Sequence, residues 1–250
     1  MESMTKDALY IFLIGHVIGD FYLQSSKLAI KKNGSFKILL KHSFIYFISM
    51  VVVTIPIFSL SIMKWICIIS IAHFIVDSLK YIFKKKIVTD DRIEAVVYCG
   101  DQIIHIILII FVAIAILISS EPVSYIYSVQ YLLGTLQINA TNILSWILIL
   151  LIIIQPFSIT LKKVLYRYKP SINEEDGGIP NAGAVIGMLE RCIILLMLSV
   201  NQYAAIGFVL TAKSIARYNK IVEDPQFSEY YLLGTLLSTM LVIAAYLLIF

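Results

Sequence analysis

The stretch "GDQIIHIILIIFVAIAILISS", residues 100–120, decides the fold class because it is apolar for long enough to cross a lipid bilayer. A membrane-spanning helix needs roughly 20 predominantly apolar residues. The only ionisable side chains in this stretch, Asp101 and His105, stand four residues apart near its start. A backbone surrounded by lipid must satisfy its own hydrogen bonds, so the stretch is expected to be a helix.

The rest of the chain has the same character. Of its 250 residues, 60% are hydrophobic and 14% are charged, and the mean hydropathy is +0.90. A soluble domain needs more polar side chains than this to cover its surface. We therefore predict an integral membrane protein, an all-α polytopic bundle that is multi-pass in the cell membrane. Eight apolar stretches are expected to span, at residues 8–24, 38–60, 62–83, 96–118, 141–162, 181–200, 202–219 and 230–250.

The basic residues predict which ends of these helices face the cytoplasm. Seventeen of the 20 Lys and Arg residues lie at alternate junctions between the stretches. They are Lys27, Lys31, Lys32, Lys37, Lys41, Lys80, Lys84, Lys85, Lys86, Arg92, Lys162, Lys163, Arg167, Lys169, Lys213, Arg217 and Lys220. Because positive residues are retained on the cytoplasmic side, both termini are expected outside.

Three regions follow from this pattern. Residues 1–118 are expected to form a four-helix domain, residues 119–140 an outer connection, and residues 141–250 a four-helix C-terminal membrane region. The first domain contains a weak repeat, "IGHVIGD" at 14–20 and "IAHFIVD" at 71–77, which suggests a duplicated two-helix hairpin.

Polar residues of one kind gather in the first domain. All four histidines lie there, and three of them stand four residues from an aspartate, so that each pair shares one helical face. The expected helix directions place these side chains at a similar depth, near the cytoplasmic leaflet. The seven candidate ligands of a divalent metal ion are His16, Asp20, His42, His73, Asp77, Asp101 and His105.

Imidazole nitrogen and carboxylate oxygen together suit zinc, manganese or iron, and seven such groups are enough for one ion with its supporting residues or for two ions. Ionisable groups inside a membrane are costly unless they are paired or solvated, which favours a functional site. A hydrogen-bonded network that only joins the helices is the alternative.

These motifs resemble an uncharacterised family of bacterial membrane proteins. Over residues 10–110 the family pattern is H-x-x-x-D-F-x-x-Q, a lone His, H-F-x-x-D-x-x-K and D-Q-x-x-H. The chain matches it with His16, Asp20, Phe21 and Gln24, then His42, then His73, Phe74, Asp77 and Lys80, then Asp101, Gln102 and His105. The same combination is similar to the membrane-bound metal-dependent hydrolases. The resemblance implies a metal-dependent hydrolase in a bacterial inner membrane.

The predicted chemistry is hydrolysis of a phosphoester or lipid-linked phosphate near the cytoplasmic leaflet, by water activated on the metal. Asp77, Asp101 and Lys80 are the candidate catalytic residues. The two carboxylates bind the ion or orient the imidazoles, and the lysine balances charge. Two alternatives stay open: a metal-ion or proton-coupled transporter that uses the His/Asp pairs, and a non-catalytic membrane scaffold.

The candidate substrate-binding residues are Gln24, Glu190, Arg191, Lys213 and Arg217. Lys213 and Arg217 are expected on one helical face, where they could hold a phosphate. A structural pair between Glu190 and either Arg191 or Lys213 is the alternative. Membrane lipid is an expected partner and nucleic acid is not, because the basic residues are accounted for by membrane topology. The oligomeric state is left open.

Overall fold

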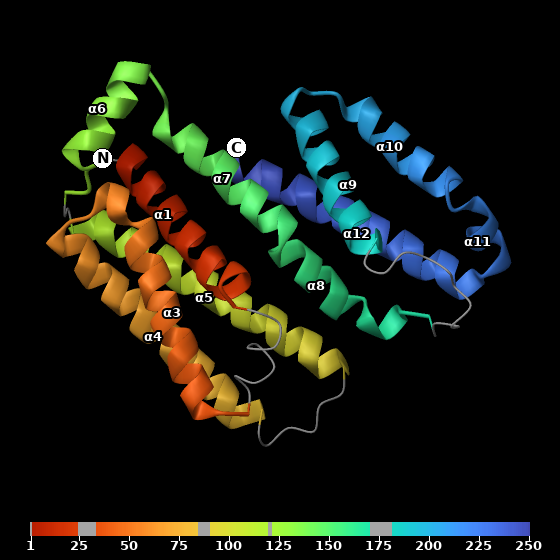
Figure 1. Ribbon diagram of the computed structural model, residues 1–250, viewed down its shortest axis with the longest axis horizontal. Coiled ribbons are helices and arrows are strands. Elements are labelled where there is room, and N and C mark those ends of the chain that lie inside the picture. Colours follow the sequence, from red (N-terminus) through yellow and green to blue (C-terminus); the bar gives the residue numbers. More distant parts are fainter. Residues whose placement is uncertain (1, 25–33, 85–90, 120–121, 171–181) are drawn as a thin grey trace. The chain divides into compact units, whose positions relative to one another are not determined.

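The computed structural model describes residues 2–24, 34–84, 91–119, 122–170 and 182–250 (Figure 1). Throughout these ranges the regular structure is helical, as the sequence predicts. The chain forms two compact units, residues 1–151 and residues 152–250. The sequence predicts a domain boundary at the outer connection, residues 119–140. In the structure the chain divides between residues 151 and 152, near the end of the helix that follows this connection.

The first unit is built around four helices. They are α1 (Glu2–Val17), α3 (Phe36–Val53), α4 (Leu60–Lys84) and α5 (Asp91–Ser119). Each of α1 and α4 packs against both α3 and α5, so the four helices close a ring around one core (Figure 1). Two further helices complete the unit, α6 (Tyr127–Leu136) and α7 (Ala140–Ile154).

The buried side of this ring is apolar away from the polar cluster. Its core includes Phe12 from α1, Met50 from α3, Ile66 from α4 and Ile109 from α5, each no more than 1% exposed. The outward side is equally apolar, and on α5 the side chain of Phe111 is 63% exposed. Large apolar side chains on both sides of a helix are typical of a bundle surrounded by lipid.

Two helix ends differ from the expected boundaries for identifiable reasons. Helix α3 ends at Val53 and not at residue 60, because Pro56 cannot donate a backbone hydrogen bond to continue the helix. A short 3-10 turn, η2 (Ile55–Ile57), follows it. Helix α5 begins at Asp91 and not at residue 96, so Asp101 and His105 lie in its third and fourth turns and not at its start.

Helix α1 does not end at Val17 but continues into a single π-helical turn, η1 (Ile18–Tyr22). A π turn accommodates one extra residue per turn and rotates the side chains that it carries relative to the preceding α-helix. Asp20 lies in this turn.

The second unit contains α8 (Pro156–Val164), a 3-10 turn η3 (Tyr166–Tyr168), α9 (Ala182–Ser199), α10 (Tyr203–Ile215), α11 (Tyr218–Glu223) and α12 (Pro225–Ile249). Helix α12 packs against α8, α9 and α11, and α9 also packs against α10. Helix α12 begins at Pro225, and the Asp224 carboxylate caps it by accepting a hydrogen bond from the Phe227 backbone N–H at 3.0 Å.

Among the described residues, six helices are long and apolar enough to cross a membrane. They are Phe36–Val53, Leu60–Ile82, Arg92–Ser119, Ala140–Val164, Ala182–Ser199 and Pro225–Ile249. The multi-pass membrane architecture therefore stands, with six candidate spans where the sequence predicts eight. The other two expected spans correspond to α1 with η1, and to α10, an apolar helix of 13 residues. Among the basic residues used to predict topology, Lys27, Lys31, Lys32, Lys85 and Lys86 lie outside the described residues.

Candidate metal centre

The seven predicted ligands converge inside the first unit. Helix α1 and the turn η1 contribute His16 and Asp20, α3 contributes His42, α4 contributes His73 and Asp77, and α5 contributes Asp101 and His105. The exposed fraction of these side chains lies between 0% and 7%. Ionisable side chains are rarely buried to this degree unless they are paired or bind a metal.

Asp20 is the central carboxylate of this cluster. Its Oδ1 atom lies 3.0 Å from His73 Nε2 and 3.2 Å from His42 Nε2. Its Oδ2 atom accepts a hydrogen bond from Gln102 Nε2 at 3.4 Å. Side chains from α3, α4 and α5 therefore contact Asp20, which lies in the π turn.

The cluster divides into three overlapping groups of potential metal ligands. Within each group, one ligand atom per residue lies within 4.8 Å of the others. The groups are His16 with Asp20 and His73, His42 with His73 and Asp77, and Asp77 with Asp101 and His105. Each group combines one of the predicted i, i+4 pairs with a residue from a neighbouring helix.

Several ring nitrogens in the cluster lack a hydrogen-bond partner among the described residues. They are His16 Nε2, His42 Nδ1, His73 Nδ1 and both nitrogens of His105. For His73, a ring proton on Nε2 would be donated to Asp20 and would leave Nδ1, 3.8 Å from Asp77 Oδ2, as the nitrogen that can bind a metal ion. Buried polar atoms without partners are rare, and a missing metal ion is one of the recognised explanations. The donor set and the unpaired atoms therefore fit a divalent cation.

Tyr46 on α3 supports two of the histidines and was not among the predicted site residues. Its ring stacks on the His73 ring with centroids 3.7 Å apart, and its hydroxyl lies 3.4 Å from His16 Nδ1. With His16 Nε2 as the ligand, the imidazole proton sits on Nδ1 and is donated to the Tyr46 oxygen. The signal in the sequence was its position four residues after His42, on the same helical face.

Lys80 and Gln102 lie beside the cluster. Lys80 Nζ donates to Asp101 Oδ2 at 2.5 Å, and Gln102 Nε2 donates to the same oxygen at 3.3 Å. The lysine therefore faces the site, as predicted from its place one turn after Asp77. Gln24, a predicted substrate-binding residue, follows η1, and its side-chain nitrogen is buried without a partner among the described residues.

Helices α1 and α3 approach closely at the cluster because α1 carries glycine there. A Cβ atom on Gly15 would lie 2.7 Å from Met50 Sδ, and one on Gly19 would lie 2.8 Å from Tyr46 Cδ2. Ser49 on α3 also donates a hydrogen bond to the Gly15 carbonyl at 3.1 Å. The two glycines allow the separation that brings Tyr46 and His42 to the ligands of α1.

Three of the other predicted substrate-binding residues are engaged within the second unit. Lys213 Nζ donates to Glu190 Oε2 at 2.5 Å and to Thr235 Oγ1 at 2.9 Å. Arg191 donates to the Ile153 carbonyl at 2.6 Å and to Ser158 Oγ at 2.5 Å. Glu190 thus pairs with Lys213, which is the structural alternative that the sequence left open.

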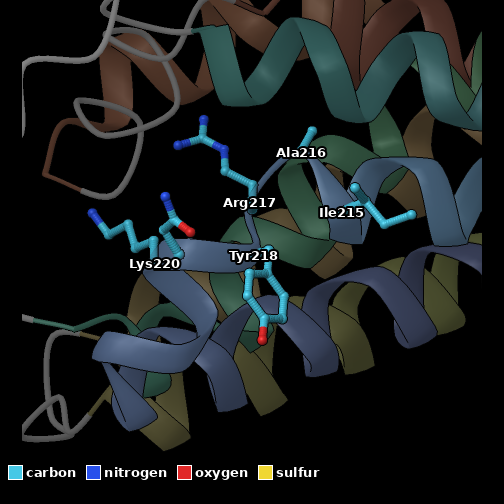
Figure 2. A pocket seen from close by; sticks show the side chains of 6 residues that line it. Ile215, Ala216, Arg217, Tyr218 and Lys220 are labelled. Carbon is cyan, nitrogen blue, oxygen red and sulfur yellow. The ribbon is translucent and has the colours of Figure 1, made fainter.

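Arg217 does not lie within the helix that carries Lys213, although the sequence predicts that the two share one helical face. Helix α10 ends at Ile215, so Arg217 lies in the bend before α11. There it lines an open pocket of about 260 Å³ formed by residues 215–220. Figure 2 shows the Arg217 and Lys220 side chains extending toward one side of this pocket and Ile215 toward the other.

Comparison with known proteins identifies the family but no activity. The model of a family described as "Protein of unknown function (DUF3307)" matches residues 8–134, which is just over half of the chain. The match extends beyond the motifs at 10–110 that carry the resemblance, and the likeness to hydrolases stays a prediction. Searches of curated proteins and of solved structures returned no match. The chain belongs to the DUF3307 family, whose function is unknown.

Proposed function

We propose that this protein is a membrane-embedded, metal-dependent hydrolase that acts on a phosphoester or lipid-linked phosphate at the cytoplasmic leaflet. One observation carries the proposal: four helices and the turn η1 bury seven His and Asp side chains, which form three overlapping groups of three whose ligand atoms lie within 4.8 Å of one another inside each group. Zinc, manganese and iron all accept this mixture of nitrogen and oxygen ligands.

A divalent ion held here would lower the pKa of a bound water toward neutrality and so provide the nucleophile for hydrolysis. The residues of the chain supply the rest. Asp77 and Asp101 would bind the ion or orient the imidazoles, and Lys80 offsets the charge of the phosphate group, while the proton that the water loses passes to the leaving alcohol. The oxygen of water forms a bond to phosphorus, the bond to the alcohol breaks, and the alcohol leaves with a proton. Gln24, in the same unit as the cluster, is proposed to contact the substrate, and a role of Arg217 in substrate binding stays a prediction.

The proposed topology has eight spans in a bacterial cell membrane, with both termini outside. The alternation of basic junctions supports it, because Lys and Arg are retained on the cytoplasmic side. Under this topology the cluster lies toward the cytoplasmic ends of α1 and α3. A lipid-linked or amphipathic phosphate would meet it from the inner leaflet.

A transporter of a metal ion or of protons is the second candidate, and the burial of the ligands favours it. His42 is 0% exposed and His73 is 1% exposed, as expected for an ion site closed to both sides of a membrane. A hydrolase must open such a site to its substrate, whereas a transporter must open it alternately to the two sides.

The metal site is tested with two aspartates of the same helix. Asp20→Asn removes the charge of the central carboxylate, and we expect the purified protein to lose at least tenfold in affinity for manganese or zinc. Asp7→Asn is the matched control. Asp7 is 2% exposed but accepts hydrogen bonds from Tyr125 and Thr141, at the other end of α1. Elemental analysis after dialysis measures both variants, and equal metal contents in the two would exclude the site.

The activity is tested separately from the site. The purified protein with manganese or zinc is assayed against phospholipids and polyprenyl phosphates, with and without a chelator. Turnover that the chelator abolishes and that His73→Ala lacks supports the hydrolase. Uptake of the metal into proteoliposomes, with no turnover of any substrate, would instead establish the transporter.

A further inference from the structure

The seven ligands contain two complete triads that share no residue. His16, Asp20 and His73 form the first, and Asp77, Asp101 and His105 form the second. The third group, which includes His42, shares one residue with each of them. The two triads are adjacent, since the His73 and His105 rings stack with their centroids 4.3 Å apart. Ions in two-metal sites stand about 3.5–4 Å apart, so the cluster has the ligands and the proximity for two.

The two triads differ in the charge beside them. Lys80 Nζ stands 2.5 Å from Asp101 Oδ2 in the second triad, where it repels a cation. Asp101 Oδ1 and both ring nitrogens of His105 nevertheless have no hydrogen-bond partner among the described residues. The second triad therefore has ligand atoms without hydrogen bonds, although the Lys80 ammonium already neutralises part of the negative charge of its two carboxylates.

Charge balance limits how many ions this buried cluster can hold by itself. Three carboxylates and the Lys80 ammonium give it a net charge of −2 when the four imidazoles are neutral, which is their ligand form. One divalent cation brings the cluster to zero. A second would leave two uncompensated positive charges in a buried site, which is unfavourable unless an anion enters with it.

We propose that the cluster holds one resident divalent ion in the triad of His16, Asp20 and His73, and takes up a second in the triad of Asp77, Asp101 and His105 only together with a phosphate group. A phosphate dianion would restore neutrality and would accept hydrogen bonds from the Lys80 ammonium. The inference rests on the proposed metal site and adds to it the class of substrate that the site selects.

The test is a measurement of manganese stoichiometry on the purified full chain in detergent. Equilibrium dialysis is run with inorganic phosphate or with sodium chloride at the same ionic strength. We expect one manganese ion per chain in chloride and two in phosphate. Electron paramagnetic resonance provides a second readout, because only the phosphate sample should give the spectrum of two coupled manganese ions.

Two lysine variants of α4 and one aspartate variant of α5 separate charge from other effects. In Lys80→Met the cluster carries one more negative charge, so the second ion should bind in chloride at least tenfold more tightly than in the unsubstituted protein. Lys64→Met is the control, because Lys64 lies near the start of the same helix, over the Trp65 ring. Asp101→Asn should keep the first ion and lose the one that depends on phosphate, and circular dichroism verifies that each variant is folded.

The outcomes distinguish this inference from the function on which it rests. One ion per chain in both solutions, or two in both, would overturn the link to phosphate and leave the metal site in place. No bound manganese in either solution would overturn the metal site itself.

Discussion

At the scale of single residues, the site depends on groups that fix the histidines as much as on the ligands. Tyr46 is 1% exposed, stacks on His73 and contacts His16 through its hydroxyl. We expect Tyr46→Phe to weaken metal binding by about tenfold, because the oxygen that orients His16 is lost while the stacked ring remains. Tyr46→Leu should weaken metal binding further, because the stacked ring is lost as well. Calorimetric titration with the metal measures both variants.

Tyr125→Phe serves as the control for Tyr46. The Tyr125 hydroxyl donates to Asp7 at 2.9 Å, at the end of α1 away from the cluster. Burial and the neighbouring Asp7 carboxylate raise the pKa of the Tyr125 phenol, so it stays protonated and donating at neutral pH. Its removal should lower thermal stability with no change in metal affinity. Equal losses of affinity in Tyr46→Phe and Tyr125→Phe would show that Tyr46 has no specific role.

The metal ligands could be predicted from the sequence, whereas the contacts that orient them could not, and the reason is physical. The His/Asp pairs were recognisable because i, i+4 spacing places two ligands on one helical face, whichever helix lies opposite. The contacts of Asp20 with His42 and His73 depend on how α1, α3 and α4 pack. Spacing along one helix contains no information about that packing, and the tyrosine at 46 resembles any other aromatic residue of an apolar helix.

At the scale of helices, the close approach of α1 to α3 positions the cluster. We expect Gly19→Ala to destabilise the protein by about 1–3 kcal/mol, because the new methyl group would overlap the Tyr46 ring that stacks on His73. Gly100→Ala is the matched control on α5, where a Cβ atom meets nothing within 4 Å. It should be neutral or stabilising by up to about 1 kcal/mol, since alanine is the better helix former. Thermal unfolding in detergent compares them, and equal melting temperatures would contradict the close-packing account.

The second unit has its own buried polar contact between helices. Glu190 on α9 is 5% exposed and pairs with Lys213 on α10. We expect Lys213→Met to destabilise this unit by about 3 kcal/mol, because it leaves a buried carboxylate without its partner. The double variant Glu190→Gln with Lys213→Met should lose less than the sum of the single variants. Lys162→Met, at an exposed position on α8, is the control.

The helix boundaries show what periodicity and hydropathy can and cannot predict. All eight expected stretches overlap a helix, because a long apolar run in lipid has no other way to satisfy its backbone. The π turn at Ile18–Tyr22 was not predicted, since no residue type specifies one. The end of α10 at Ile215 was also not predicted, so Arg217 lies in the bend after this helix and not within it.

At the scale of the whole molecule, the two compact units divide the candidate residues between them. Every proposed metal ligand belongs to residues 1–151, whereas Glu190, Arg191, Lys213 and Arg217 belong to residues 152–250. The family match at 8–134 lies entirely within the first unit. The metal site is therefore expected to be a property of the first unit, and a role of these four second-unit residues in substrate binding stays a prediction.

This division predicts which helices lose protection from hydrogen exchange when the metal is removed. An ion present at about 100 times its dissociation constant stabilises the state that binds it by about 2.7 kcal/mol. Hydrogen exchange should therefore slow about a hundredfold on metal binding in α1, α3, α4 and α5, where opening releases the ion, and it should not change in α9 and α12. Mass spectrometry of the loaded and chelated protein measures each helix, with Asp20→Asn as the variant that should no longer respond. Equal protection of α9 would contradict the division, because it would mean that the second unit, through a residue such as Glu190, takes part in holding the metal.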